Sequence, residues 1–310
     1  MPRLALALAS LVLSLALGPV VRAQPPPAPP DHVERRTAVL EGDVPVRVAT
    51  RWSAETSTSG TSIAIGDAAP VVLVRGASAA AVEAGEHGAI VAYESYEDAH
   101  PFRWRTIRRV DGHDVLGDEH TTGRPIARAG DIPFAVAIAA IPGRGFALFF
   151  EEIQSDDPTA ARTYLLVVDA DGAPSGPMFE IAVPWPLAGA AWDGSGYHLA
   201  LIYPGGGGGM RLSMVQITEQ GAPRQHPDWS SEPGEIADVH LVTEGASVVA
   251  HYRRDTHWLA ADVTAIASWG QNRRHATEHG TLGEGVTIGA DGAGHLTRIA
   301  EHDDGLAPAR

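Results

Sequence analysis

The chain of 310 residues contains neither cysteine nor lysine, and these absences narrow its chemistry. Without cysteine there is no disulfide, no thiolate zinc site, no cysteine nucleophile and no lipid-bearing cysteine, so core packing must hold the fold together. All basic residues are arginine, and the formal net charge of -15 at pH 7 repels nucleic acid and anionic lipid. We therefore expect no nucleic-acid partner.

Long apolar segments are also scarce. After residue 30 no stretch keeps the i, i+3, i+4, i+7 apolar spacing of a helix, whereas Gly is abundant and Val, Ile and Ala occur in short runs, which favours β-structure. The exception is the run from Leu4 to Leu17, which follows Arg3 and precedes a Gly-Pro helix break. This layout is typical of a secretory signal peptide cleaved after Ala23. The alternative is an uncleaved anchor, but the run is shorter than the roughly 20 residues that a bilayer requires.

A proline-rich stretch, QPPPAPPDH, follows the predicted cleavage site and is typical of an extended tether. We therefore expect a secreted or periplasmic protein with no membrane span after cleavage. The predicted organisation is a signal peptide at 1–23, a linker at 24–34 and a single domain at 35–310.

Similar segments recur through the rest of the chain. Each is an apolar strand of about six residues that begins at a small residue and runs into a polar loop, and successive segments start 48 to 57 residues apart. They begin at Gly88, Gly145, Gly196, Ala246 and Gly294. About 25 residues after each of the first four comes a turn that ends in glycine, as a tight hairpin requires. These turns are Asp111-Gly112, Asp171-Gly172, Gln220-Gly221 and Trp269-Gly270.

Each unit reads as four strands, of which the first is rich in small residues, as in AAAVEA, FAVAIAA and AGAAW. Four antiparallel strands per 50 residues or so is the pattern of a β-propeller blade, whose innermost strand has little room around the central axis. A pair of β-sandwiches is the main alternative, but it does not predict a shared period.

The last unit is incomplete, because the chain ends before its outer two strands. Residues 36–50 read as a third strand, a turn and a fourth strand, so we expect them to complete the blade that residues 284–302 begin. The predicted fold is an all-β propeller of five four-stranded blades. Residues 51–79 are a long loop or an extra hairpin in this scheme, and the count becomes six if they contain a divergent blade.

One unit, AAWDGSGYHLALIY, carries Trp192, Asp193, Gly194 and Tyr197. It resembles the W-D/N-G-x-x-Y entry strands of secreted bacterial β-propeller repeat proteins. The resemblance implies a propeller without a defined activity, since that architecture serves binding, scaffolding and catalysis alike.

Acidic side chains recur in the loops between second and third strands, which should share one rim of the ring. Such a rim could hold Ca²⁺ or a basic partner, and the alternative is that these are solvated loop charges. The candidates are Glu97, Asp98, Asp156, Asp157, Asp303 and Asp304, with Glu94 and Glu151 where the preceding strands end. Asp169 to Gly172 has the D-x-D-G form of a calcium loop, but its place in the repeat favours a plain turn.

Catalytic signals are sparse. A propeller glycosidase would need two carboxylates on the inner strands, and Glu83 and Asp238 are the best available. We therefore predict a binding or scaffold module for a protein or glycan ligand, without a defined cofactor. The alternative is a carbohydrate-active propeller hydrolase that uses Glu83 and Asp238.

Near the C-terminus, HATEH places His275, Glu278 and His279 in the order of the inverzincin zinc motif. That motif works only on a helix, where the two histidines share a face with the glutamate nearby. The repeat instead predicts an outer strand or a connection between blades, where Glu278 points away from the histidines. We therefore interpret the motif as a polar blade edge.

Overall fold

A computed structural model describes most of the chain after residue 31. It shows an all-β protein, and within the described ranges there is no helix long and apolar enough to cross a membrane. The described residues are 32–53, 58–75, 77–95, 102–122, 136–153, 161–183, 187–205, 209–225, 230–264, 277–281, 286–293 and 295–300.

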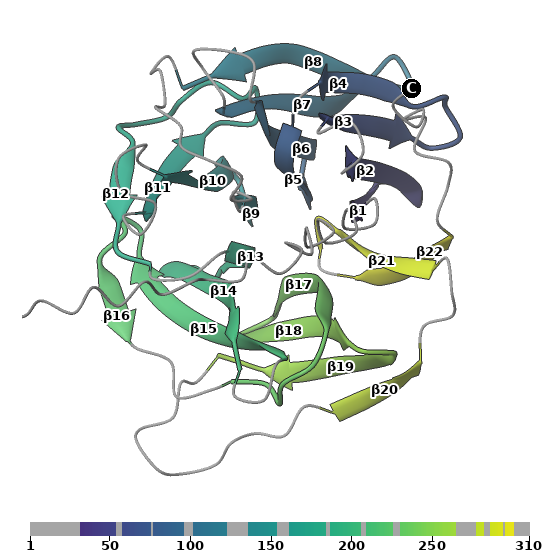
Figure 1. Cartoon of the computed structure of the whole chain (residues 1–310). Helices are drawn as coiled ribbons and strands as arrows, with labels where there is room; N and C mark the ends of the chain where they lie inside the picture. The colour runs from purple at the N-terminus through teal and green to yellow at the C-terminus, as the bar shows by residue number, and fades with distance from the viewer. Residues whose placement is uncertain are drawn as a thin grey trace, which may run out of the picture.

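Five four-stranded antiparallel blades are arranged in a ring, which confirms the predicted propeller (Figure 1). Blade 1 contains β1 (His32–Leu40), β2 (Val44–Ser53), β3 (Thr58–Ile65) and β4 (Val71–Arg75). Blade 2 contains β5 (Ala77–Gly85), β6 (Gly88–Ser95), β7 (Phe102–Val110) and β8 (His113–Thr121). Blade 3 contains β9 (Val136–Ile141), β10 (Gly145–Ile153), β11 (Ala161–Val168) and β12 (Phe179–Ile181). Blade 4 contains β13 (Leu187–Trp192), β14 (Gly196–Pro204), β15 (Met210–Thr218) and β16 (Pro223–Gln225). Blade 5 contains β17 (Ile236–Glu244), β18 (Ser247–Arg254), β19 (His257–Asp262) and β20 (Thr277–Thr281).

A C-terminal hairpin of β21 (Val286–Asp291) and β22 (Leu296–Ala300) lies between blades 5 and 1 (Figure 1). It joins the sheet of blade 1, as the closure argument expected, but in a different order. The sheet runs β22-β21-β1-β2-β3-β4, and β21 pairs in parallel with β1 at Ala38 and Val39. The N-terminal strands are therefore the first and second strands of their own blade, and not the third and fourth of the last one.

Residues 51–79, expected as a loop, an extra hairpin or a hidden blade, supply the end of β2, all of β3 and β4, and the start of β5. The extra-hairpin alternative is thus the one that the structure shows, since β3 and β4 pair with each other and complete blade 1.

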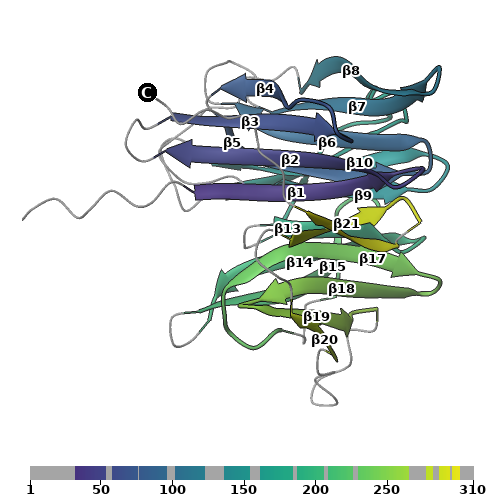
Figure 2. The same cartoon turned by 90° about the vertical axis from the view of Figure 1, so that its right-hand side faces the viewer.

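The two faces of the ring differ in what they carry. Because every blade has four antiparallel strands, each first strand starts on the same face and ends on the other, and strands run between the faces (Figure 2). We call the face with the turns from first to second and from third to fourth strand the turn face. The opposite one, with the loops from second to third strand and between blades, is the loop face.

A backbone contact explains the repeated glycine that opens the second strands. A Cβ at Gly88 would lie 2.2 Å from the carbonyl oxygen of Ile107, and one at Gly145 would lie 2.3 Å from that of Val168. Both glycines also have positive φ, at 135° and 125°. Only glycine lets the third strand approach this closely, so the period visible in the sequence has a steric cause.

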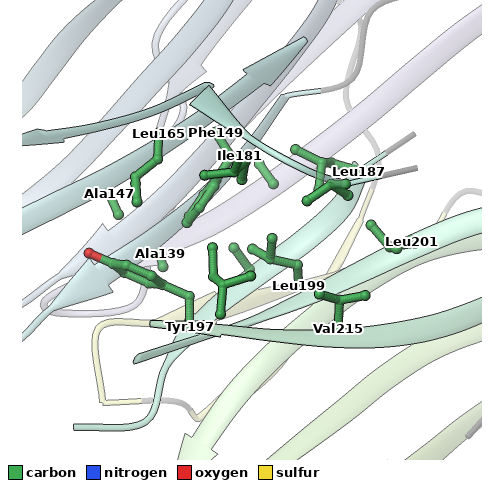
Figure 3. Packing of buried hydrophobic residues seen from close by; sticks show 14 of the residues in the cluster. Ala139, Ala147, Phe149, Leu165, Ile181, Leu187, Tyr197, Leu199, Leu201 and Val215 are labelled. Atoms are coloured by element: carbon green, nitrogen blue, oxygen red, sulfur yellow. The ribbon is translucent and has the colours of Figure 1, made fainter. Parts of the chain in front are cut away.

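The core lies between neighbouring blades. Blades 3 and 4, for example, share a cluster in which Phe149 meets Tyr197 edge-on with ring centroids 5.2 Å apart (Figure 3). Small inner-strand residues such as Ala139 and Ala190 let the sheets converge there, and both are buried. Burial of such side chains contributes most of the stability of a chain without disulfides.

Candidate functional site

A cavity of about 260 Å³ opens on the turn face between blades 2 and 3. Its lining comes from the starts of β6 and β10 and the ends of β7 and β9. The β5–β6, β9–β10 and β11–β12 turns surround its mouth. The apolar lining residues are Ala89, Ile107, Ile141 and Phe146, and of these only Phe146 packs its side chain in the cluster between blades 2 and 3. The titratable residues of the mouth are Glu86, His87, Arg108, Arg144, Asp169 and Asp171.

The anchor glycines bring charged residues of neighbouring strands to the mouth of this cavity. Because Gly88 and Gly145 admit the third strand so closely, the ends of β7 and β11 lie beside the turns that precede β6 and β10. Arg108 at the end of β7 and Asp169 just after β11 therefore reach the mouth.

Bonds between the blades hold the walls in place. The backbone N–H of Gly143 donates to Glu86 Oε2 at 3.0 Å, which ties the β9–β10 turn to the β5–β6 turn. Arg108 Nη1 of blade 2 forms an ion pair with Asp171 Oδ1 of blade 3. Both partners are solvent-exposed, so this pair contributes little to stability and serves to orient the groups.

The β11–β12 turn forms the third wall. Asp169 Oδ1 accepts hydrogen bonds from the backbone N–H groups of Asp171 and Ala173, both at 2.9 Å, as in an Asx-type turn. The buried Trp104 donates from Nε1 to the carbonyl oxygen of Gly172 at 2.8 Å and thereby fixes the turn against blade 2. The acids of the D-x-D-G sequence thus fold a turn and line the cavity mouth.

Glu83, one of the two predicted acids, lies near the turn-face end of the axis. It is the seventh residue of β5 and its pKa is raised well above the usual range by burial. Two residues further on, Gly85 meets the β21–β22 turn, where a Cβ on Gly292 would lie 2.5 Å from the Gly85 carbonyl oxygen. The chain therefore packs backbone against backbone at this end of the axis.

Asp238, the other predicted acid, lies near the loop-face end, as the third residue of β17. Its Oδ2 accepts from Arg253 Nε at 2.8 Å and its Oδ1 accepts from Thr287 Oγ1 at 3.5 Å. Asp238 has a positive φ of 49° at an irregularity in the β17–β18 register. All inner strands run from the loop face to the turn face. Glu83, near the end of β5, and Asp238, near the start of β17, therefore lie at opposite ends of the axis.

The structure adds two axial groups that sequence reasoning missed. Arg36 on β1 reaches the Ala188 carbonyl oxygen on β13 at 3.3 Å and pairs with Glu34 at 2.7 Å. His240 on β17 has a pKa lowered to about 4, first by burial and then by the charge of Arg36. For His240 the available signal was a histidine within β17, IADVHLVTE, whereas β1, HVERRTAVL, carries several polar residues among which Arg36 does not stand out.

The turn between β13 and β14 brings together Asp193, Ser195 and His198, three residue types of a hydrolase triad. Asp193 Oδ1 accepts from Ser195 Oγ at 2.9 Å, while its Oδ2 bonds His198 Nε2 at 3.0 Å. The serine therefore bonds the carboxylate and not the imidazole, which leaves the hydroxyl without a base. Asp193 also accepts from the backbone N–H of Ser195 and of Gly196, both at 2.8 Å, so it caps the turn.

The predicted acidic rim lies outside the described residues at all six positions: Glu97, Asp98, Asp156, Asp157, Asp303 and Asp304. Of their neighbours, Glu94 and Glu151 lie in β6 and β10 and are buried, not solvated in a loop. Within the described ranges, no three His, Asp or Glu side chains are grouped as a metal site requires.

The HATEH segment is partly described, since His275 lies outside the described residues. Thr277–Thr281 forms β20, which pairs antiparallel with β19 at the outer edge of blade 5. This confirms the expected outer strand. Glu278 Oε1 lies 2.9 Å from His257 Nδ1 on that neighbouring strand.

Comparison with known proteins finds similarity only to solved structures, at low identity. No family model and no curated protein matches the chain. Among solved structures, a fungal lectin from Aleuria aurantia, described as a six-bladed β-propeller that recognises fucose, is 10% identical, with a TM-score of 0.46 and coverage of 88% of both chains. The parainfluenza virus 5 hemagglutinin-neuraminidase is 9% identical, with a TM-score of 0.41 over 87% of this chain and 85% of its own. At such identities the likeness concerns the fold and not the ligand.

Proposed function

We propose that this protein is a binding propeller whose pocket between blades 2 and 3 captures a small, neutral, polyhydroxylated ligand such as one sugar unit of a glycan. The cavity itself carries the proposal, because it joins the aromatic side chain of Phe146 to a mouth of fixed hydrogen-bonding groups. Its volume of about 260 Å³ is just below the roughly 300–1,000 Å³ of sites for drug-sized ligands, which suits a smaller molecule.

The charges at the mouth favour a neutral ligand. Three carboxylates and two guanidinium groups line it, so the rim is slightly negative and disfavours an anion. Hydroxyl groups both donate and accept, and they can therefore bond to the carboxylates and to the guanidinium groups at once. The C–H face of a sugar ring would pack on Phe146, whose side chain belongs to the cluster between blades 2 and 3.

The test is a titration of ¹⁵N-labelled protein with glucose, galactose, mannose and N-acetylglucosamine, observed by NMR. We expect shifts of the Gly88, Gly143 and Gly172 amides with at least one sugar, and a weakened response in Arg108→Ala. Arg162→Ala is the matched control, since Arg162 is also 43% exposed and also forms an ion pair, with Glu180. Galacturonic acid, which has a carboxylate in place of the C6 hydroxymethyl group of galactose, should bind more weakly. If no sugar shifts these amides, the proposal is wrong.

The hydrolase alternative rests on Glu83, whose raised pKa suits a general acid. Glycosidases hold their two carboxyl groups roughly 5–9.5 Å apart, whereas Asp238 lies toward the other end of the axis and pairs with Arg253. Binding without hydrolysis is therefore the better-supported function. Release of reducing sugar from a polysaccharide, lost in both Glu83→Gln and Asp238→Asn, would favour the hydrolase.

Export from the cytoplasm is part of the proposal, and so is a relationship to secreted bacterial propeller repeat proteins. Export is supported by the early cation and apolar run of residues 1–23, and the relationship by the W-D-G-x-x-Y stretch. Intact mass measurement of protein from the medium or periplasm should show a chain that begins at Gln24. Protein found only inside the cell with Met1 retained would contradict export.

A further inference from the structure

Two features of the pocket between blades 2 and 3 are repeated one blade further round the ring. Gly196 opens β14 as Gly145 opens β10, and a Cβ there would lie 2.3 Å from the Ile217 carbonyl oxygen. Gly221 in the β15–β16 turn has a φ of 82°, close to the 85° of Gly172 in the β11–β12 turn. The turns that surround the first pocket therefore have counterparts at the boundary between blades 3 and 4.

Tyr197 occupies the place at this second boundary that Phe146 has at the first, since each directly follows its anchor glycine. Its ring is fully buried and packs against Phe149 and Trp192, with centroid distances of 5.2 Å and 4.8 Å. The phenolic oxygen points out of the apolar cluster (Figure 3). Among the described residues this buried hydroxyl has no hydrogen-bond partner.

An unpaired buried hydroxyl costs free energy, so a native structure that keeps one calls for an explanation. Phenylalanine serves at the equivalent place one blade earlier, so packing alone does not require the hydroxyl. A ligand oxygen that accepts from Tyr197 would remove the cost when it binds.

Two charged groups flank the hydroxyl. Arg144 Nη1 of the β9–β10 turn pairs with Glu219 Oε1 of the β15–β16 turn across the boundary. Both charges act on the Tyr197 hydroxyl, whose pKa is raised first by burial and then by Glu219, so it stays protonated as a donor. The arginine is 51% exposed and the glutamate 35%, so water already competes for the pair and a ligand hydroxyl can insert.

Arg144 also lines the first pocket, so one side chain stands between the two boundaries. We propose that the boundary between blades 3 and 4 is a second site for the same class of polyhydroxylated ligand. There Tyr197 and Arg144 donate to ligand oxygens and Glu219 accepts from a ligand hydroxyl. This inference rests on the proposed function and adds that adjacent sugar units of one glycan can engage two neighbouring sites.

The experiment is the NMR titration with the same four sugars, with the amides of Gly194, Gly196 and Gly221 as reporters of the second site. We expect Tyr197→Phe to abolish their response while the amides around the first pocket respond with an unchanged apparent Kd. Arg108→Ala should weaken the first-site response and leave the second-site response unchanged, and Arg144→Ala should weaken both responses about tenfold. Arg162→Ala should change neither.

The outcomes separate the two proposals. No response at either boundary overturns the proposed function and the second site together. A response at the first boundary alone overturns the second site only. A full second-site response in Tyr197→Phe shows that the hydroxyl does not contact the ligand, which also overturns the second site as stated.

Discussion

Substitution of Gly145 by alanine tests the steric cause of the repeat, with Gly143→Ala as its matched control in the same turn. Both glycines have positive φ, 125° for Gly145 and 70° for Gly143. A Cβ at Gly143 meets nothing within 4 Å, whereas one at Gly145 would lie 2.3 Å from the Val168 carbonyl oxygen and 2.6 Å from the Asp169 carbonyl carbon. The two variants therefore differ in backbone contact.

The left-handed conformation alone should cost Gly143→Ala about 1–2 kcal/mol of unfolding free energy. Gly145→Ala combines backbone strain at a positive φ with displacement of the β11 backbone. Strain and overpacking each cost roughly 1–3 kcal/mol, so this variant should lose roughly 2–6 kcal/mol of unfolding free energy. Because a domain is stable by only about 5–15 kcal/mol, the second variant approaches the limit of folding.

Urea denaturation followed by tryptophan fluorescence measures both values, provided that the m-value stays constant. Gly145→Ala should also weaken sugar binding, because Asp169 moves with the β11 backbone. Equal losses in the two variants, within about 0.5 kcal/mol, would refute the steric explanation of the period.

Three further predictions concern single side chains. Burial raises the pKa of Glu83, so the contribution of its carboxyl group to stability is intact below the unfolded pKa and is lost as pH rises through the folded pKa. Glu83→Gln should therefore gain stability relative to wild type from acidic to neutral pH, measured by urea denaturation at several pH values. A stability difference that does not change with pH would contradict this. Tyr197→Phe should leave the ligand-free protein equally stable or up to roughly 1–3 kcal/mol more stable, and a clear loss would reveal a partner for the hydroxyl. Asp193→Ala removes the cap of the β13–β14 turn and should cost roughly 1.5–3 kcal/mol; an unchanged denaturation midpoint would contradict the capping role.

The propeller was predictable because its period has a backbone cause. Gly88, Gly145 and Gly196 admit a neighbouring carbonyl oxygen, and no larger residue can replace them without moving it. The predicted first strands AAAVEA, FAVAIAA and AGAAW correspond to β5, β9 and β13.

The order of strands at the ring closure was less accessible. In blade 1 the second strand starts at Val44 after the Gly42-Asp43 turn, so no glycine marks it in the way that Gly88 marks β6. Without that marker, residues 36–50 read equally well as outer strands. Only the pairing of β1 with β21 shows that they are inner ones.

The inter-blade pocket was not predicted, because it exists only where turns of two blades meet. The acidic residues of the sequence pointed to the loop-face rim and to the axis. Glu86 and Arg144 lie instead beside the anchor glycines on the turn face. A charged residue one or two places before a repeated glycine was the available signal. The meaning of that signal depends on which turns are neighbours in space.

A crystal structure of the protein with the sugar that gives the largest NMR shifts tests the central claim most directly. The account predicts ligand density between blades 2 and 3, over Phe146 and within hydrogen-bond distance of Arg108 or Glu86. Density confined to the axis beside Glu83 or His240, or to the loop face, would contradict it.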